Sequence, residues 1–542
     1  MSYYKSNSAK RGRYSSSGDE DDGCKELREK LRGEEFRNLD IPGKADYLLR
    51  NVFKLKDFRT TEQKEAIYNA MKGIGDTYIC FPTGAGKSLC YQLPALSRSG
   101  VTIVFSPLIA LMEDQVNYLR SLNIKCCAWN SNLDDTERSS ICRDLMGEKP
   151  PKHRIVYTSP ESINSKFFCK IVKKLGSSGR LNFFVVDEAH CISYWGHEFR
   201  SDYLKLSRMR SLCWTVPWII LTATANPETE SSILRSLQCN TFQKGALKIF
   251  KTTPRRKNLF YDVFFEEAFR EGETREKHIL EYIKMMTRVL KARHGKDFND
   301  FVGIVYCRTI DSCTKMAKFL SENGLPSAAY HSQLPIDEKT SVQEQWMSNV
   351  LTAVCATIAF GMGINKSNVR FIVHHFPPDN LAAYYQESGR AGRNGEESYC
   401  RLYYSQKIKK KMTVFLKEKL KEIEGEEIQE EIKEIRRNSA VDNYQKMIEY
   451  CESTGCRNQA LCKYFQPSER IDDCKDHCDA CKHGQILKAR LKMFRDYVPK
   501  SKKKEIPSTI LKRPPSASDK DISDDDDTGH PAAKKVRLAE DE

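Results

Sequence analysis

The chain of 542 residues lacks any apolar stretch that approaches the roughly 20 residues needed to cross a bilayer. Its first stretch, MSYYKSNSAKRGRYSSSGDEDD, has no apolar core, so we do not expect it to act as a secretory signal. These absences argue against a membrane protein or a secreted one, and we expect no membrane partner.

A disulfide scaffold is not expected either, although the chain has 20 cysteines. Without a sign of secretion, most thiols should be reduced core residues, and a few could hold metal. The length allows several domains, and a hydrophobic share of 40% is enough to build real cores.

Acidic residues are fewer than basic ones: the chain has 73 Asp and Glu and 88 Lys and Arg, which gives a net charge of +15. A basic excess favours a polyanionic partner, since basic side chains that meet phosphates release condensed counterions. Merely solvated Lys and Arg would give the same balance, so charge alone does not decide between the two interpretations.

Short apolar runs that alternate with longer helix-like segments dominate the chain between residues 45 and 405. This pattern is typical of parallel sheets covered by helices on both faces, so we expect an α/β fold with two tandem sheets. Segment 241–262 separates the two series and is the expected hinge, and the Lys- and Glu-rich stretch 407–437 predicts an exposed helix or helical hairpin. The runs are 77–81, 101–105, 155–158, 183–186 and 218–221, then 303–306, 353–356, 371–374 and 400–404.

A phosphate-binding loop follows the first run and reads Pro82, Thr83, Gly84, Ala85, Gly86, Lys87 and Ser88. Glycines let backbone N–H groups face phosphates, and the helix that follows favours negative charge at its start. We expect Lys87 to reach the β- and γ-phosphates of ATP and the Ser88 hydroxyl to ligate Mg²⁺. The strict pattern requires glycine where Phe81 stands, so this loop alone leaves a chance match open.

A pair of carboxylates ends the run 183–186, in the sequence Asp187-Glu188-Ala189-His190. The carboxyl end of a buried strand is where the Mg²⁺ of a nucleotide can be held. We expect Asp187 to bind the metal, through water, and Glu188 to orient or deprotonate the attacking water.

Two arginines spaced by two small residues lie in the second series, within Gln386-Glu387-Ser388-Gly389-Arg390-Ala391-Gly392-Arg393. Gln386, Arg390 and Arg393 are the catalytic candidates of this segment. The two arginines could cross a cleft to the γ-phosphate and stabilise transition-state charge as arginine fingers. A salt-bridged surface turn is the ordinary alternative.

Three cysteines within eight residues, Cys474, Cys478 and Cys481, predict a structural zinc site that needs a fourth ligand. Cys451, Cys456, Cys462 and His477 are the available candidates, and unliganded thiols in a loop-rich region remain the alternative. Zinc held here should contribute folding energy rather than chemistry.

At this point the sequence resembles the RecQ-type DNA helicases of superfamily 2, over roughly residues 48–485. Many proteins have a phosphate loop, but very few follow DEAH with CISYWGHEFRSDY. Within the family, the YYQESGRAGRNGEESYCRLYYS stretch and the short build resemble the fifth animal branch in its short form. The matching stretches are FRTTEQ (58–63), FPTGAGKSLCYQLPAL (81–96), SPLIALMEDQV (106–116), DEAHCISYWGHEFRSDY (187–203), LTATA (221–225), ATIAFGMGINKSNVRF (356–371) and YYQESGRAGRNG (384–395).

The resemblance implies RecA-like lobes and an ATP-dependent 3′→5′ DNA helicase of recombination, repair or replication. It implies that Arg59 and Gln63 recognise adenine, and that Cys456 is the fourth zinc ligand. It also implies an aromatic loop that senses single-stranded DNA and licenses ATP hydrolysis; packed core rings are the plain alternative for it. The DNA-binding candidates of that loop are Tyr194, Trp195, His197, Phe199 and Arg200.

The expected domains are a disordered tail (1–44), an ATP-binding lobe (45–240), a lobe with the arginine fingers (241–405), a helical zinc-binding module (406–485) and a disordered tail (486–542). Many family members add a winged-helix domain that separates strands, and we do not expect one here. A translocase that unwinds poorly and a strand-annealing protein with a regulatory ATPase therefore remain alternatives. Residues 531–538, PAAKKVRL, resemble a nuclear import signal, so the expected partners are single-stranded and partly duplex DNA, recombination or replication proteins and an import receptor.

Overall fold

A computed structural model of the chain describes residues 22–194, 199–239, 246–295, 301–358, 360, 366–471 and 474–497. Within these ranges no helix is both long and apolar enough to span a membrane. All the elements discussed below belong to one unit, Met1–Asp496. The expected import signal and most of the expected C-terminal tail lie outside the described residues.

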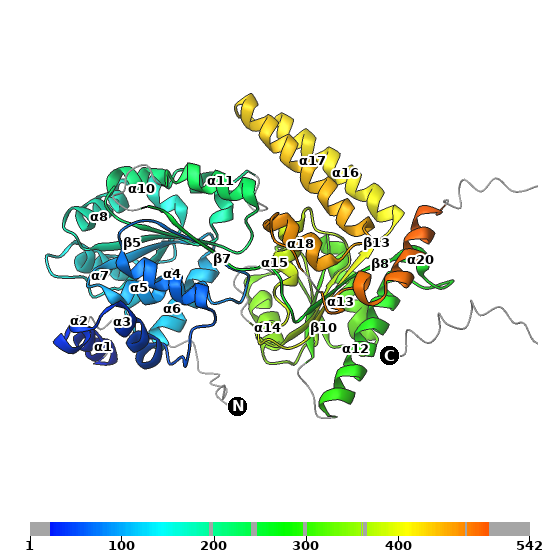
Figure 1. The fold of residues 1–542 in the computed structure, drawn as a ribbon, viewed down its shortest axis with the longest axis horizontal. Coiled ribbons are helices and arrows are strands. Elements are labelled where there is room, and N and C mark those ends of the chain that lie inside the picture. Colours follow the sequence, from blue (N-terminus) through cyan, green and yellow to red (C-terminus); the bar gives the residue numbers. More distant parts are fainter. Residues whose placement is uncertain are drawn as a thin grey trace, which may run out of the picture. The chain divides into compact units, whose positions relative to one another are not determined.

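The first lobe is a parallel sheet of seven strands in the order β3-β4-β2-β5-β6-β1-β7. Apolar side chains alternate between its two faces, where one core includes α4, α5 and α6 and the other includes α7, α8, α10 and α11 (Figure 1). The strands are β1 Thr77–Cys80, β2 Val101–Phe105, β3 Cys126–Trp129, β4 Ile155–Thr158, β5 Leu181–Val186, β6 Trp218–Thr222 and β7 Lys248–Lys251. The helices are α4 Thr61–Lys72, α5 Leu89–Ser97, α6 Ile109–Ser121, α7 Asp135–Met146, α8 Lys166–Ser177, α9 Ser201–Leu204, α10 Ser207–Leu212 and α11 Pro227–Ser236.

Three helices precede this sheet, where the sequence led us to expect a disordered tail up to residue 44. They are α1 Asp22–Arg32, α2 Glu34–Asn38 and α3 Ile41–Tyr47, followed by η1 Leu48–Val52. Leu27 and Leu31 are spaced four apart, so they share one helix face and pack against the core. Phe36 is 3% exposed. The expectation of disorder was wrong for residues 22–44. This segment is rich in charged residues, but it also has a narrow stripe of apolar residues that packs against the core.

The second lobe is a parallel sheet of six strands in the order β10-β11-β9-β12-β13-β8. Its strands are β8 Leu259–Phe265, β9 Val302–Tyr306, β10 Ser327–Tyr330, β11 Ala353–Ala356, β12 Val369–His374 and β13 Ser398–Tyr404. Its helices are α12 Arg275–His294, α13 Ile310–Glu322, α14 Ile336–Met347 and α15 Leu381–Ser388. Cores lie on both of its faces.

The boundary between the lobes differs from the expected one at residue 240. Strand β7 pairs in parallel with β1, so the first lobe continues at least to Lys251. Strand β8, part of which we had assigned to a hinge, is already the edge of the second sheet. The stretch that connects the sheets is therefore residues 252–258.

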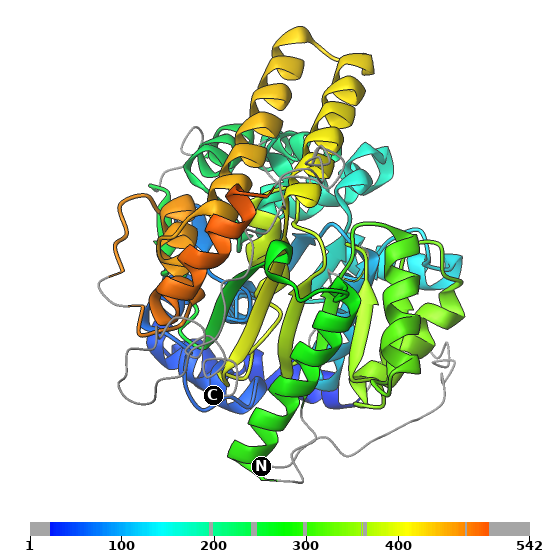
Figure 2. The same ribbon diagram turned by 90° about the vertical axis from the view of Figure 1, so that its right-hand side faces the viewer.

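A helical hairpin and a cysteine-rich module follow the second lobe. Helices α16 Gln406–Gly425 and α17 Glu430–Glu452 lie side by side, as the sequence predicted for one of its two alternatives (Figure 2). The module comprises α18 Arg457–Phe465, α19 Asp479–Lys482 and α20 Gly484–Arg495. Helix α20 runs ten residues past the expected boundary at 485, because Leu487, Leu491 and Phe494 recur at helical spacing and are buried.

The module covers the open edge of β8. The Tyr261 N–H donates to the His477 carbonyl at 3.2 Å, and the Val263 N–H donates to Asp479 Oδ2 at 2.9 Å. Tyr261 and Cys478 form an isolated parallel bridge. An uncovered edge strand would offer these groups to other chains, so the module protects the sheet.

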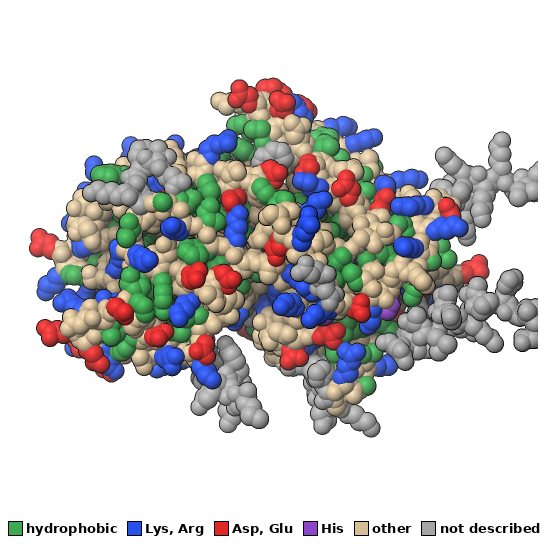
Figure 3. Space-filling model, viewed as in Figure 1, with side chains coloured by type: hydrophobic (Ala, Val, Ile, Leu, Met, Phe, Trp, Pro, Cys, Tyr) green, Lys and Arg blue, Asp and Glu red, His purple; other side chains and the backbone are tan. Residues whose placement is uncertain are grey.

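Basic and acidic side chains are interspersed on the face of the molecule in Figure 3. The net charge of +15 is therefore not gathered into a single patch on that face.

Candidate functional site

The phosphate loop connects β1 to α5 and depends on two glycines with left-handed backbone. Gly84 has φ +85° and Gly86 has φ +83°, a region that side chains disfavour. A Cβ added to Gly86 would lie 2.5 Å from Gln63 Nε2. Lys87 Nζ reaches across the loop and donates to the Phe81 carbonyl at 3.2 Å. Phe81, the departure from the strict pattern, is 1% exposed and fills the core beneath the loop.

Arg59 and Gln63 lie directly against this loop. Gln63 Nε2 donates to the Gly86 carbonyl at 3.0 Å, and Arg59 donates to the Gly84 carbonyl. Thr60 caps α4 by accepting from the Gln63 N–H at 3.1 Å, which fixes the start of the helix. Because the Gln63 amide is engaged with the loop, adenine recognition by this pair stays a prediction and requires these bonds to exchange.

Asp187 and Glu188 follow the buried strand β5. The Asp187 N–H donates to the Phe105 carbonyl at 2.9 Å, which extends the pairing with β2. Burial and the neighbouring Glu188 charge raise the pKa of Asp187 to about 7, against the opposing effect of Lys87. A nearby cation would stabilise the ionised form of this carboxyl group. Glu188 has φ +48°, and its Oε2 lies 3.4 Å from His190 Nδ1.

The predicted catalytic residues of the second lobe lie on α15 and in the turn after it. Gln386 is 7% exposed and Arg390 is 6% exposed. The position of a Cβ on Gly84 lies 3.5 Å from Arg393 Cγ, so Arg393 contacts the phosphate loop of the first lobe. Burial, followed by the charges of Arg390 and Arg256, lowers the pKa of Arg393 to about 9. Positive charges this close together are stabilised when an anion binds between them.

Arg256, on the connection between the sheets, is a residue that the sequence did not single out. It donates to the Thr83 carbonyl of the phosphate loop at 3.0 Å. It also donates to the Ala391 and Gly392 carbonyls of the arginine turn at 3.1 and 2.9 Å. One guanidinium therefore joins the backbones of both halves of the site. The only sign of this residue in the sequence was a pair of adjacent arginines in the expected hinge.

Part of the aromatic loop lies within the described residues. The rings of Tyr194 and Phe199 stack with centroids 4.1 Å apart. Both line a cavity together with Gln386, Arg390 and Arg436. Trp195 and His197 lie outside the described residues.

The end of this loop is attached to the nucleotide site. Arg200 donates to the Pro107 carbonyl at 2.5 Å, and the Tyr203 hydroxyl donates to the Asp187 carbonyl at 3.1 Å. The contact of Tyr203 with the Asp187 backbone was also missed from the sequence.

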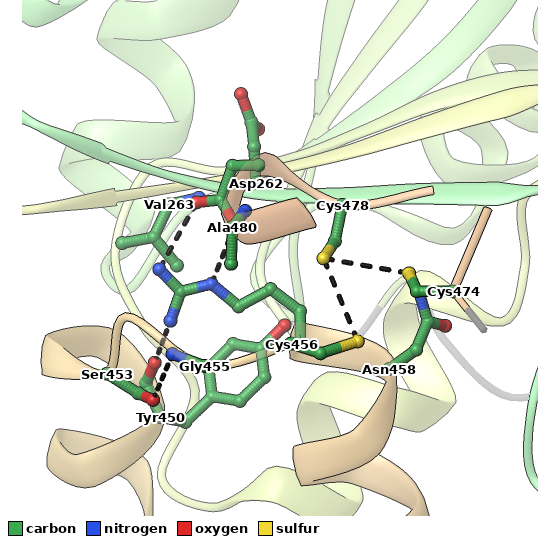
Figure 4. A network of polar contacts seen from close by, with 12 residues as sticks. Asp262, Val263, Tyr450, Ser453, Gly455, Cys456, Asn458, Cys474, Cys478 and Ala480 are labelled. Carbon is green, nitrogen blue, oxygen red and sulfur yellow. Dashed lines mark hydrogen bonds and ion pairs between the residues drawn. The ribbon is translucent and has the colours of Figure 1, made fainter. Parts of the chain in front are cut away.

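The sulfur atoms of Cys456, Cys474, Cys478 and Cys481 all lie within 4.8 Å of one another. The Cys474–Cys478 and Cys478–Cys456 sulfur distances are 3.7 and 3.9 Å (Figure 4). A tetrahedral zinc ion with Zn–S bonds of about 2.3 Å separates its sulfur ligands by about 3.8 Å. The four thiols therefore fit zinc, and Cys451, Cys462 and His477 do not join this group in the described part of the chain.

Buried polar contacts hold these thiols in place. Cys456 is the N-cap of α18, and its sulfur accepts from the Gln459 N–H at 3.4 Å. Asn458 Nδ2 donates to the Cys474 sulfur at 3.3 Å. Arg457, which is fully buried, pairs with Asp479 at 2.9 Å and so connects the two cysteine segments.

Comparisons with known proteins agree with this geometry. Three family models match: DEAD/DEAH box helicase over residues 60–232, helicase conserved C-terminal domain over 281–395 and RecQ zinc-binding over 412–482. The chain is 39% identical over 82% of its length to ATP-dependent DNA helicase Q5 of Rattus norvegicus. It is 36% identical over 81% of its length to ATP-dependent helicase SGS1 of Saccharomyces cerevisiae. It covers 44% and 28% of these two proteins, so it spans less than half of either.

Solved structures share the fold. A Mycobacterium smegmatis helicase Lhr bound to ssDNA and AMP-PNP has a TM-score of 0.51 at 17% identity, over 76% of this chain and 58% of that one. Mss116p bound to ssRNA and AMP-PNP has a TM-score of 0.52 at 16% identity, over 80% and 89%. These solved structures show the fold alone. The three matching family models, which include RecQ zinc-binding, and the 39% identity to ATP-dependent DNA helicase Q5 show that the chain belongs to the RecQ family of helicases.

Proposed function

We propose that the chain is an ATP-hydrolysing DNA helicase that moves 3′→5′ on single-stranded DNA and separates duplexes. The observation that carries the proposal is the meeting of Gly84 with Arg393 and of Thr83 with Arg256 across the two lobes. A nucleotide held between these groups would join the lobes, and its hydrolysis would release them. The similarity to ATP-dependent DNA helicase Q5 supports DNA as the track.

Each half of the site has a proposed task in hydrolysis. Lys87 and the N–H groups of Thr83, Gly84, Ala85 and Gly86 hold the phosphates, and Arg59 and Gln63 bind the adenine. Glu188 orients the attacking water, while Arg390 and Arg393 stabilise charge on the γ-phosphate, with Gln386 beside them.

Mg²⁺ is the proposed metal of this site. The Ser88 hydroxyl at the start of α5 and the Asp187 carboxylate at the end of β5 offer the hard oxygen donors that it prefers. When bound, Mg²⁺ neutralises charge on the β- and γ-phosphates. The raised pKa of Asp187 is consistent with this role, because a cation favours the ionised carboxylate.

The stacked pair of Tyr194 and Phe199 is proposed to receive bases of single-stranded DNA, together with Trp195, His197 and Arg200. Base stacking on aromatic rings is worth about 1–3 kcal/mol per base and does not depend on sequence. The Tyr203–Asp187 bond gives a physical route by which a base bound at this loop affects the metal-binding carboxylate.

We further propose that the protein works in the nucleus in recombination, repair or replication, with partner proteins of those processes and a receptor that reads residues 531–538.

ATP turnover with single-stranded DNA, duplex DNA and RNA, for the wild type and Lys87→Ala, tests the motor. We expect DNA to stimulate turnover, and Lys87→Ala to lower it about 100-fold or more. Turnover that ignores DNA would refute the motor. Partial duplexes with a 3′ or a 5′ overhang then fix the direction and separate a helicase from a translocase or an annealing protein.

A further inference from the structure

His374 and Glu387 form a buried pair in the second lobe that has no task in the hydrolysis described above. His374 ends β12, and its Nε2 lies 2.8 Å from Glu387 Oε2 on α15. His374 is fully buried and Glu387 is 8% exposed. An ionised carboxylate only accepts hydrogen bonds, so we assign the proton of the imidazole to Nε2, which donates to Glu387. The other ring nitrogen, Nδ1, has no hydrogen-bond partner among the described residues.

Aromatic rings hold His374 in this orientation. Tyr306 stacks on the imidazole with ring centroids 5.4 Å apart and an angle of 20° between the planes, and Tyr384 packs against it at 4.9 Å. Tyr306 is itself fixed, because its hydroxyl donates to the Phe360 carbonyl at 3.1 Å. The imidazole therefore cannot turn away without disturbing its neighbours, and the Glu387 carboxylate stays bound to it.

Glu387 lies three residues before Arg390, one of the two proposed arginine fingers. The Arg390 N–H donates to the Glu387 carbonyl at 3.2 Å, so a helical turn continues from one residue to the other. Side chains at this spacing are neighbours, and opposite charges there attract each other. Both side chains line one cavity of about 220 Å³. An ion pair that would neutralise Arg390 is therefore within reach of Glu387.

The pKa of Tyr306 also places the two charges near one point. Burial raises the pKa of this hydroxyl to about 12, while the charge of Arg390 opposes the rise and the charge of Glu387 adds to it. Both charged groups therefore lie close to the same ring.

No such ion pair is present in the described part of the chain. Glu387 pairs with His374, and Arg390 has no carboxylate partner. Arg390 is buried, and its Nε has no hydrogen-bond partner. Arg308, which also lines the cavity, is paired with Asp379 at 2.6 Å. The positive charge of Arg390 thus remains available to an anion.

We propose that His374 is a positioning residue that keeps Glu387 away from Arg390, so that Arg390 retains its charge for the γ-phosphate. The inference rests on the proposed function, in which Arg390 is an arginine finger. Without His374 the Glu387 carboxylate would be buried and unpaired, which is costly, and pairing with Arg390 would relieve that cost. Arg390 would then be neutralised before hydrolysis, so turnover would fall while ATP binding changed little.

ATP turnover of the full chain with single-stranded DNA tests this, for His374→Phe, Glu387→Gln and the double variant. We expect His374→Phe to lower turnover about tenfold. The double variant should return to the level of Glu387→Gln alone, because an amide does not neutralise Arg390. His374→Gln, which keeps an N–H donor, should retain more turnover than His374→Phe. The matched control is His278→Phe, the same change at a buried histidine of this lobe that contacts the Tyr403 hydroxyl, and it should leave turnover unchanged.

A second comparison separates the charge of Arg390 from packing. In an Arg390→Ala background, measured with enzyme in excess over ATP, His374→Phe should cause no further loss, because no arginine remains to be neutralised. An equal loss with and without Arg390 would assign the effect to packing and overturn the inference. Melting curves show that each variant is folded at the assay temperature. Should His374→Phe not fold, His374→Met makes the same comparison with a more adaptable side chain.

Two further results would overturn the inference and leave the proposed function intact. One is a double variant that stays as slow as His374→Phe. The other is a loss in Glu387→Gln as large as that in His374→Phe. If Arg390→Ala alone has normal turnover, the assignment of Arg390 as an arginine finger is wrong, and the inference falls with it.

Discussion

The two lobes have the same strand order, but they carry different chemistry at corresponding positions. Reading the sheets in parallel, β3-β4-β2-β5-β6-β1 of the first lobe corresponds to β10-β11-β9-β12-β13-β8 of the second. Strand β1 leads into the phosphate loop, whereas β8 leads into a short turn, η4 Glu266–Ala268, and the long helix α12. The same architecture therefore carries the proposed phosphate-binding loop in one lobe and the proposed arginine fingers in the other.

The outer edges of these corresponding strands are also treated differently. In the first lobe β7 pairs with β1 as a further strand. In the second lobe the segment around Cys478 takes that place beside β8. The first lobe completes its sheet with backbone alone, and the second depends on a module that holds a metal.

The change Arg393→Ala should have the largest effect, because it removes the positive charge that the second lobe is proposed to bring to the γ-phosphate held by the first lobe. We expect DNA-stimulated turnover to fall about 10³-fold while ATP affinity changes little. Phosphate release and nucleotide binding, measured on the same preparation, check this. The exposed Lys315→Ala on α13 is the control. A loss of ATP affinity as large as the loss of turnover would mean that Arg393 acts in binding rather than in catalysis.

Loss of zinc should uncover the edge that distinguishes the second lobe. Cys478→Ser is expected to lower Tm by roughly 5–10 °C, equivalent to about 2–3 kcal/mol in a domain of this size, and to promote aggregation. Calorimetry, light scattering and metal analysis check it. Cys142→Ser, a half-buried cysteine outside the cluster, is the control. Full zinc content and an unchanged Tm in Cys478→Ser would contradict the assignment.

Arg256→Ala tests whether one side chain couples the lobes. Hydrogen bonds that involve a charged group contribute about 1.5–3 kcal/mol each, so we expect turnover to fall about 10–100-fold and DNA stimulation to weaken. Arg256→Lys should recover little, because an ammonium cannot reach both backbones as a fork does. The exposed neighbour Lys257→Ala is the matched control. Normal DNA stimulation in Arg256→Ala would assign coupling to other contacts.

The smallest expected effect concerns His278 on α12. This helix follows β8 in the second lobe, where the phosphate loop and α5 follow the corresponding strand of the first lobe. Its Nδ1 lies 2.8 Å from the Tyr403 hydroxyl. Burial, and then the charges of Arg401 and Arg490, lowers the pKa of His278 to about 3. Since the unfolded histidine takes up a proton near pH 6.5, this group should cost stability progressively as the pH falls from about 6.5 to 3.

His278→Phe keeps an aromatic ring among Phe264 and Phe269 but cannot be protonated. Its Tm should therefore decline less steeply over this pH range than that of the wild type. Parallel slopes for the two proteins would show that His278 does not contribute.

The sequence predicted the interior of both sheets but not their edges. Every run that we assigned as a strand is one, and the strands without such a run are β3, β7, β8 and β10. All four lie at the ends of the strand order. The residues of β10 are only partly buried and β7 is mostly exposed, so neither needs a continuous apolar run. Strand β8 is apolar, but it directly follows the basic stretch that we took as a hinge.

The candidate site also has a part that the sequence predicted and a part that it did not. Motifs along the chain predicted Lys87, Asp187, Arg393 and the cysteine cluster, because their spacing carries the chemistry. Arg256 acts through the carbonyls of residues more than 130 positions away, and carbonyls leave no trace in a sequence. The sequence also did not predict a cavity that is lined by arginines of α1, α2 and the turns before β2 and β4, because these segments meet only after folding.

The covering of β8 has a consequence for protein synthesis. Val263 and the Asp479 carboxylate that it contacts are 216 residues apart. At about 5–20 residues per second, a ribosome needs roughly 10–40 s to make the second after the first. Most of the second sheet is made during that interval, and its last strand, β13, ends at Tyr404, 75 residues before Asp479. The complete sheet therefore waits about 4–15 s for the segment that covers its edge.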